Sequence, residues 1–516
     1  MDIKSQTLLV CIIAGLSLTV AIFRHLISAA NSSCLPPGPT GKLFSGVKSQ
    51  LPSSEPWKTY RAWSKQYASK IISFRVYNKI YVVLNDTASV GALLQARANI
   101  YSDRPFLWMF NVICARGKAI FNISSLDPRH RIYRRLLQQG LGTRATRDAW
   151  QTMKTQTGFL LDGFEKDPEK WREHIRRNAA GIIMKLAFGY EVNGLDDPFV
   201  KIADETSKIS GWVSTPGRWI VERFPFLRHF PSFLPGMQWK RQGLEWRDKL
   251  EYLSDIPHRW VKEQMVHGHY DESFTSRLLV GDGSSPTNPE YEDIIKWCAS
   301  GLYAGAADTI VSAMISFVLL MALHPEIQSK AQSEIERAFP DYTWVKDQSS
   351  SNSNLPNPDE VRKLEYLDAI FKEVLRYAPV GNLALPHRVT EDDEYCGYSI
   401  PKNATVIGNI WALMHDSEVY PDPYTFNPER FIQPLKRDNS STGKNLPQPD
   451  PRQFAFGFGK RVCPGSHFAE STILLTMASI LIRFEIRKTS VDERPVEFTT
   501  GITSHIKPFP IQLVLR

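Results

Sequence analysis

Residues 456–465 (FGFGKRVCPG) constrain this chain most, because they place one cysteine, Cys463, in a glycine-rich turn directly before an apolar run. Gly457, Gly459 and Gly465 permit positive φ angles and let the backbone pass close to a flat, bulky ligand. We therefore expect Cys463 to be available as a metal-binding thiolate. A buried free cysteine beside an ordinary glycine-rich turn is the alternative.

The charges around Cys463 favour the thiolate over the thiol. A helix that begins near His467 would add about half a positive charge at its N-terminus. Lys460 and Arg461 add whole charges. Zinc would need further Cys or His ligands at short spacing, but the nearest other cysteine is Cys396. A single axial thiolate indicates haem.

The composition is that of a large globular protein with many loops. The chain has 516 residues, of which 42% are hydrophobic, and 34 prolines, with no internal repeat. Its net charge of +8 fits a membrane surface or an acidic redox partner, and no basic run interleaved with aromatic residues indicates nucleic-acid binding. Its six cysteines show no paired spacing, which indicates a reducing environment such as the cytosol.

The N-terminus carries an uncharged segment, residues 7–23, whose length is close to that needed to cross a bilayer. A signal peptide would show a similar apolar run, but no convincing small-residue cleavage site follows this one. We therefore predict a membrane anchor within residues 1–34. Residues 35–516 would form the main domain, with a stiff proline-rich hinge in residues 35–41.

The longest helix candidate covers residues 291–323 and ends before Pro325. Its uncharged part is too short to span a bilayer, so we expect a helix of a soluble core. At its centre, small residues such as Ala304 would let a planar cofactor approach the backbone. Asp308 and Thr309, an adjacent acid and alcohol, could pass protons to a ligand bound above that cofactor. Such a pair in a helix usually has only a structural role.

Other segments have clear secondary-structure patterns. Residues 71–84 are rich in Ile, Val, Phe and Tyr around a central turn, which predicts two strands of a small sheet. Residues 365–377 and 467–482 predict two further helices. Residues 205–240 combine aromatic residues with frequent prolines, which predicts a broken, exposed apolar lip.

The turn around Cys463 resembles the haem-binding signature of the cytochrome P450 family. That signature (Phe, two residues, Gly, one residue, Arg, one residue, Cys, one residue, Gly) is matched by Phe456, Gly459, Arg461, Cys463 and Gly465. The resemblance implies a mainly α fold with a small β region, here with one N-terminal transmembrane helix. It also implies haem b, with Cys463 as axial ligand and the rest of the turn, including Gly457, around the cofactor.

The resemblance further implies residues that bind the haem propionates. The family usually has Trp, three residues, then Arg in one helix, and this chain has His130 and Arg134 at those positions. A solvated basic helix face is the alternative. His387 or Arg388 would be a second propionate partner, and the sequence leaves both open.

A buried ion-pair network is implied by Glu373 and Arg376, which lie on one helix face, and by Arg430 of the motif PERF. These residues would lock the segment that leads to Cys463, a structural role. The resemblance also implies an apolar substrate pocket, although core packing explains several of its residues equally well. The pocket residues would be Phe106, Trp108, Ala304, Leu383 and Ile502.

The resemblance covers essentially the whole chain and implies a monooxygenase of the microsomal type. Asp308 and Thr309 would manage the protons that promote O–O cleavage. No nicotinamide-binding fingerprint or flavin domain is visible. Electrons from NADPH would therefore come through a cytochrome P450 reductase, with cytochrome b5 as a further candidate donor.

Several segments, including YSDRP at residues 101–105 and FTTGI at residues 498–502, resemble fungal P450s of secondary metabolism. This implies oxidation of a terpenoid, polyketide or indole scaffold at the endoplasmic reticulum membrane, by a domain facing the cytosol. Two alternatives are weaker. A haem-thiolate isomerase or dehydratase would have little use for Asp308 and Thr309, and a non-catalytic membrane protein that binds haem or a steroid would not need all these motifs.

Overall fold

The computed structural model describes residues 35–281, 288–340, 355–432, 448–489 and 496–516. The anchor predicted in residues 1–34 lies outside the described residues. The described chain is mainly helical with three small sheets, as expected. Its α-helices are α2 (Pro56–Gln66), α3 (Thr87–Val90), α4 (Ala98–Tyr101), α5 (Pro128–Leu141), α6 (Thr143–Asp148), α7 (Trp150–Lys166), α8 (Trp171–Phe188), α9 (Pro198–Val213), α10 (Gln238–Glu251), α11 (Asp255–Val266), α12 (Phe274–Val280), α13 (Pro289–Leu323), α14 (Pro325–Ala338), α15 (Pro358–Val361), α16 (Glu365–Tyr377), α17 (Ile410–Met414), α18 (Arg452–Ala455) and α19 (Ser466–Arg483).

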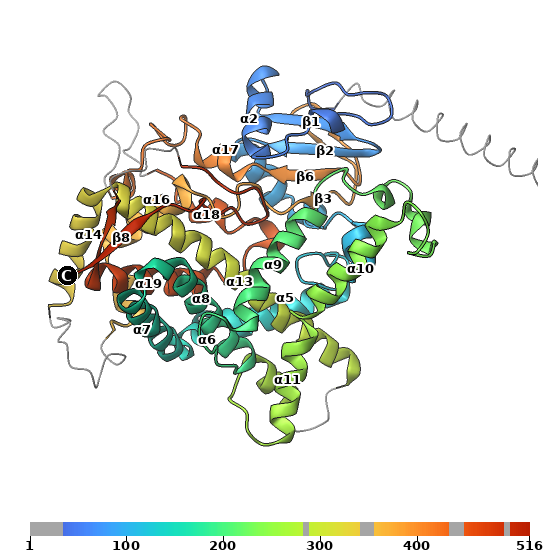
Figure 1. The fold of residues 1–516 in the computed structure, drawn as a ribbon. Helices are drawn as coiled ribbons and strands as arrows, with labels where there is room; N and C mark the ends of the chain where they lie inside the picture. The colour runs from blue at the N-terminus through green and yellow to red at the C-terminus, as the bar shows by residue number, and fades with distance from the viewer. Residues whose placement is uncertain (1–34, 282–287, 341–354, 433–447, 490–495) are drawn as a thin grey trace, which may run out of the picture.

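The strands predicted in residues 71–84 are present and belong to a larger sheet. The strands of the described residues are β1 (Ile71–Val76), β2 (Lys79–Leu84), β3 (His387–Arg388), β4 (Asp393–Tyr395), β5 (Tyr398–Ile400), β6 (Thr405–Gly408), β7 (Phe484–Lys488) and β8 (Ile511–Leu515). The main sheet has the order β1-β2-β6-β3, in which β2 and β6 run parallel and the other pairs antiparallel. Figure 1 shows this sheet at the top of the molecule, with most helices below it.

Helix α13 runs through the centre of the molecule (Figure 1) and packs against α8, α5, α16 and α19. The Asn288 side chain caps it by accepting from the Tyr291 N–H, and Pro325 prevents its continuation. It is long and apolar enough to cross a membrane, but 83% of its most apolar stretch is buried inside the protein. The prediction of a core helix is therefore confirmed.

Two more predicted helices have the expected positions. Helix α16 has the predicted bounds, because its apolar residues recur at helical spacing and face the core. Helix α19 extends one residue beyond the prediction at each end, and its middle is almost wholly buried. These two helices and α13 position two groups of residues. One is the turn of residues 456–465, called the cysteine turn below, and the other is the pair Asp308 and Thr309.

The prolines in residues 205–240 predicted a broken segment, and the structure agrees, because these residues do not form one helix. The end of α9 is followed by the short turns Ile220–Glu222 and Pro225–His229 and then by the start of α10. Several large aromatic side chains here are exposed, and Phe233 reaches 78% exposure. The exposed aromatic residues of this lip are Trp212, Phe224, Phe226, Phe230 and Phe233.

Candidate active site

The turn before α19 has the backbone conformation that its glycines predict, with one exception. Gly457 and Gly459 have φ angles of 78° and 56°, which side-chain-bearing residues rarely adopt. A Cβ on Gly459 would also lie 2.5 Å from the Leu94 carbonyl oxygen. Gly465 is different. It is the N-cap residue of α19 with a φ of −100°, so the positive φ that a glycine permits is not used there.

Cys463 is partly exposed at the end of this turn, and its backbone N–H donates to the Phe456 carbonyl oxygen at 2.7 Å. Burial raises the pKa of the Cys463 thiol, while a hydrogen bond from the Gly465 N–H and the charge of Arg134 act in the opposite direction. The protein residues alone therefore favour the thiol, contrary to our prediction. A bound metal cation would reverse this preference, since metal binding displaces the proton of a thiol.

The expected charges on Lys460 and Arg461 are not the ones directed at the sulfur. Lys460 is exposed, and the guanidinium of Arg461 donates to the carbonyl oxygens of Ser102 at 2.8 Å and Ile123 at 2.6 Å. Arg134 takes their place. Helix α5 carries it to the turn, where its Nη1 donates to the Val462 carbonyl oxygen at 2.6 Å.

Arginine and histidine side chains with little exposure gather beside the turn. Burial and the charge of Arg134 lower the pKa of Arg461 to about 10. Burial and the charge of Arg461 lower that of Arg104 to about 9. His130 is also buried, and burial together with the charges of these arginines lowers its pKa to about 4. Burial is the main cause of these shifts, the positive charges add to it, and the nearby Asp103 carboxylate acts in the opposite direction.

His387 lies beside these arginines as a neutral imidazole, and Arg388 is paired elsewhere. Burial and the charge of Arg104 lower the pKa of His387 to about 3, and its Nδ1–H donates to the Tyr101 carbonyl oxygen at 2.7 Å. Arg388 instead donates from Nε to the Asp103 carboxylate at 2.7 Å. Of the two alternatives from the sequence, the structure places His387 beside the arginines.

The cluster fits the carboxylates of a haem. Arg104 Nε and His130 Nε2 are buried polar atoms without a hydrogen-bond partner among the described residues, and such atoms are costly unless a ligand satisfies them. The carboxylate of Asp103 is unavailable, because it accepts from Ser124 and Arg388. Sequence reasoning missed Arg104, although this arginine follows a buried acid in the motif YSDRP.

The centre of α13 is open to solvent. Ala304 is exposed and Asp308 and Thr309 are partly exposed, whereas residues 310–318 are all buried. The side chains of the described residues therefore leave this face of α13 partly uncovered. The Thr309 hydroxyl donates to the Gly305 carbonyl oxygen at 2.8 Å, which keeps its hydrogen within its own helix.

The Asp308 carboxylate has partners on two other segments. Its Oδ1 lies 2.8 Å from His505 Nε2, and its Oδ2 accepts from the Ser207 hydroxyl at 2.7 Å. Burial alone would raise the pKa of Asp308, but the hydrogen bonds and charge of His505 and the hydrogen bonds of Ser207 and Thr503 hold it below its usual value. Sequence reasoning missed these partners, since nothing in the sequence links them to α13.

Glu373, Arg376 and Arg430 meet in the core. Arg376 donates to both Glu373 carboxylate oxygens, at 2.7 and 2.8 Å, and Arg430 Nε donates to Oε1 at 3.1 Å. Both arginines also donate to backbone carbonyl oxygens, those of Pro423 and Pro421. The network thus ties α16 to the segment that precedes the cysteine turn.

The expected pocket residues are all at least partly exposed. Phe106 is 46% exposed, and its ring packs edge-on against Trp108 with centroids 4.9 Å apart. Leu383 is half-buried, and Ile502 is 37% exposed. The backbone of Ile502 passes close to α9, because a Cβ on Gly211 would lie 3.5 Å from the Ile502 nitrogen.

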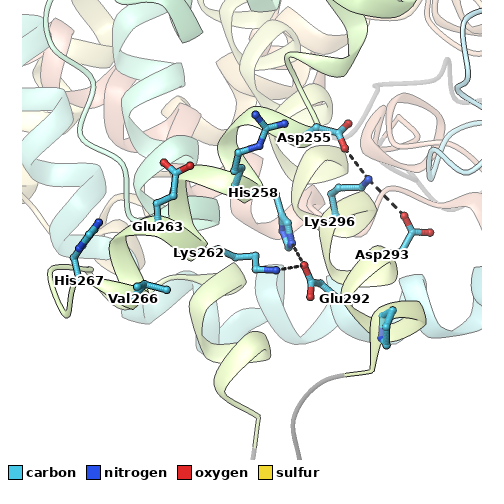
Figure 2. A pocket seen from close by; sticks show the side chains of 11 residues that line it. Asp255, His258, Lys262, Glu263, Val266, His267, Glu292, Asp293 and Lys296 are labelled. Atoms are coloured by element: carbon cyan, nitrogen blue, oxygen red, sulfur yellow. Dashed lines mark hydrogen bonds and ion pairs between the residues drawn. The ribbon is translucent and has the colours of Figure 1, made fainter.

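A charged groove lies on the surface between α11 and the start of α13, as Figure 2 shows. Glu292 binds Lys262 at 2.7 Å and lies 3.3 Å from His258, while Lys296 pairs with Asp255 at 2.8 Å. These opposite charges compensate one another. The groove is therefore an ion-pair network between two helices, separate from the cysteine turn.

The chain matches known proteins over nearly its whole length. Residues 36–513 match the cytochrome P450 family. Cytochrome P450 monooxygenase 208 of Postia placenta is 34% identical over 505 residues, which cover 97% of this chain and 93% of that protein. Cytochrome P450 monooxygenase claR of Ampulloclitocybe clavipes is 33% identical over 507 residues, or 97% of this chain and 89% of that protein.

A third relative, the tryptamine 4-monooxygenase of Psilocybe cyanescens, is 31% identical over 518 residues, which cover 98% of each chain. The resemblance seen at the cysteine turn thus extends to complete fungal proteins that carry out monooxygenation. The chain belongs to the cytochrome P450 family and is a cytochrome P450 monooxygenase, a haem-containing oxidoreductase.

Proposed function

We propose that this monooxygenase inserts one oxygen atom from O2 into an apolar small molecule of fungal secondary metabolism. The observation that carries the proposal is that the chain has both Cys463, in its glycine turn, and a cluster of arginines and histidines in which Arg104 Nε and His130 Nε2 are buried without a hydrogen-bond partner among the described residues. Haem b held there would supply the oxygen-activating chemistry. Arg104, His130 and His387 would hold its propionates.

The protein's own residues would position the reactants and move protons. Thr309 and Asp308 lie on the partly uncovered face of α13, where an alcohol and an acid could deliver protons to a ligand bound beside the helix. The half-buried Leu383 and the small Ala304 would leave room for an apolar substrate. The Glu373 network would hold the cysteine turn in a fixed position relative to α16.

The chain would receive electrons from an NADPH-dependent cytochrome P450 reductase, with cytochrome b5 as a further candidate donor. The reductase would dock beside the cysteine turn, where a surface hollow borders Phe456, Gly457 and Val462. The exposed Lys460 and the net charge of +8 suit a partner with an acidic surface.

Residues 1–34 would anchor the protein in the endoplasmic reticulum membrane, with residues 35–41 as the hinge and residues 35–516 as the cytosolic haem domain. The exposed aromatic lip around Phe226 and Phe233 would dip into the lipid and admit substrates dissolved there. Terpenoid, polyketide and indole scaffolds are the candidate substrates. The name of the tryptamine 4-monooxygenase makes the indole class the first to test.

The first experiment is the reduced carbon-monoxide difference spectrum of the purified protein beside Cys463→Ala. A strongly red-shifted Soret band that is lost in Cys463→Ala is expected for thiolate ligation of haem. Cys396→Ala is the matched control, because Cys396 is an exposed free cysteine in the β4–β5 turn and should leave the band unchanged. An unshifted band in active wild-type protein would contradict the proposed site.

Indole, terpenoid and polyketide substrates are then screened with reductase and NADPH. Oxygen-18 from O2 is expected in the product, and omission of NADPH should abolish turnover. Turnover that needs neither NADPH nor O2 would instead support a haem-thiolate isomerase or dehydratase.

A further inference from the structure

Asp308 joins three segments that are far apart in the sequence. It lies on α13, its Oδ2 accepts from Ser207 of α9, and its Oδ1 contacts His505 of the C-terminal segment. Thr503 of that same segment donates a further hydrogen bond. Polar groups of α9 and of the C-terminal segment thus both contact the Asp308 carboxylate.

The backbone of the C-terminal segment is held firmly where His505 meets Asp308. The His505 N–H donates to the Thr499 hydroxyl at 2.9 Å, and the Thr499 N–H donates back to the His505 carbonyl oxygen at 2.8 Å. The Ser312 hydroxyl of α13 donates to the Ser504 carbonyl oxygen at 2.5 Å. The imidazole of His505 is therefore presented to Asp308 from a fixed position.

The two ring nitrogens of His505 have different surroundings. Nε2 contacts the carboxylate, while Nδ1 is buried and has no hydrogen-bond partner among the described residues. Histidine is the side chain that most readily gains and loses a proton near neutral pH. The Nε2 contact fixes one oxygen of the Asp308 carboxylate, and the Ser207 hydroxyl fixes the other.

We propose that His505 is a positioning residue of the monooxygenase reaction, which holds the Asp308 carboxylate ionised and turned toward α9 and controls when it takes up a proton. The inference rests on the proposed function, in which Asp308 moves protons to bound oxygen. It adds that the packing of the C-terminal segment and of α9 against α13 sets the protonation state of Asp308.

The first test measures the protonation of Asp308 directly, without turnover. The carboxylic-acid infrared band of the full-length, haem-loaded protein is titrated with pH, and Asp308→Asn identifies the band. In His505→Gln the amide can still donate a hydrogen bond but carries no charge, so the pKa of Asp308 should rise by about one or more. Ser207→Ala should raise it by less, because the His505 contact remains.

The second test measures how electrons are used. The amount of product formed per NADPH should fall by roughly tenfold in His505→Gln, since a misdirected proton donor releases reduced oxygen instead of product. The acid limb of the pH profile should move to higher pH together with the pKa of Asp308. His269→Gln, at an exposed histidine outside the site, is the matched control and should match the wild type in both tests.

The outcomes separate this inference from the proposed function. If the wild type lacks the thiolate Soret band or NADPH-dependent product formation, the proposed function fails. If the wild type is active and His505→Gln behaves like His269→Gln, the inference alone is wrong. Should His505→Gln not retain haem, the wild-type titration decides, because an Asp308 pKa at or above the ordinary value for a carboxyl group would overturn the inference.

Discussion

At the scale of single residues, the Thr309 hydroxyl is expected to govern how efficiently reducing power is used. Thr309→Val keeps the shape but removes the hydroxyl that now donates to Gly305. We expect product per NADPH to fall about a hundredfold or more, because general acid–base groups contribute about 10²–10⁴-fold. Thr476→Val is the matched control, since Thr476 of α19 makes the same bond to the carbonyl oxygen one turn earlier. Equal losses in both variants would argue against a role for Thr309.

Arg104 is expected to control haem retention. It is buried, and its Nε has no protein partner among the described residues, so a propionate is the group that would neutralise it. Arg104→Gln should release haem roughly tenfold faster, which corresponds to the loss of one charged hydrogen bond. Transfer of haem to an apoprotein acceptor measures this rate. Arg131→Gln, an exposed arginine of α5, should not change the rate, and equal rates in the two variants would contradict the assignment.

Some features of the site could not be decided from the sequence. His387 and Arg388 are neighbours in strand β3, and successive side chains of a strand point to opposite faces. Only one of them could face the cluster of arginines and histidines, but the choice depends on how β3 pairs with β6. Gly465 shows a second limit. A glycine can adopt positive φ without being required to, and the capping of α19 decided its conformation.

At the scale of elements, the Glu373 network should carry a large share of the stability around the cysteine turn. Glu373→Gln leaves Arg376 and Arg430 buried without an anion, and breaking such a buried pair costs about 3–5 kcal/mol. The unfolding midpoint in urea measures the loss. Glu365→Gln at the exposed start of α16 should cost less than about 1 kcal/mol. A small loss in Glu373→Gln would show that the network is not needed for stability.

The elements themselves were largely predictable from the sequence. Helix α16 has apolar residues at helical spacing, and α13 and α19 contain long, nearly continuous apolar runs without an internal proline. Both kinds of pattern indicate helices without knowledge of the rest of the fold. The contact between α13 and His505 was not predictable, because it depends on how the C-terminal segment folds back over α9. Motif positions were therefore found, whereas partners brought by tertiary packing were missed.

At the scale of the whole molecule, stability should fall with acid partly through His415. This side chain is 4% exposed and stacks on Trp411, and burial, reinforced by the charge of Arg376, lowers its pKa to about 3. The unfolded chain therefore binds a proton at His415 first as the pH falls below about 6.5, the ordinary value. The stabilisation from neutral His415 is fully present above that pH and decreases down to about pH 3.

The free energy of unfolding of wild type and His415→Phe, measured from pH 7 to 4 or below, checks this. The wild type should lose up to about 1.4 kcal/mol per pH unit more than His415→Phe in this window. His269→Gln should keep the wild-type slope, since its side chain is exposed. Parallel curves for wild type and His415→Phe would mean that folding does not lower the pKa of His415.

The parallel pairing of β2 with β6 has a consequence for biosynthesis. Tyr81 in β2 aligns with Thr405 in β6, so the sheet near the beginning of the chain is completed by a strand that leaves the ribosome near the end of translation. Until then the hairpin of β1 and β2 has an unpaired edge, which can join strands of other chains. Translation pauses or truncations upstream of Thr405 should therefore yield chains that depend on chaperones and aggregate readily.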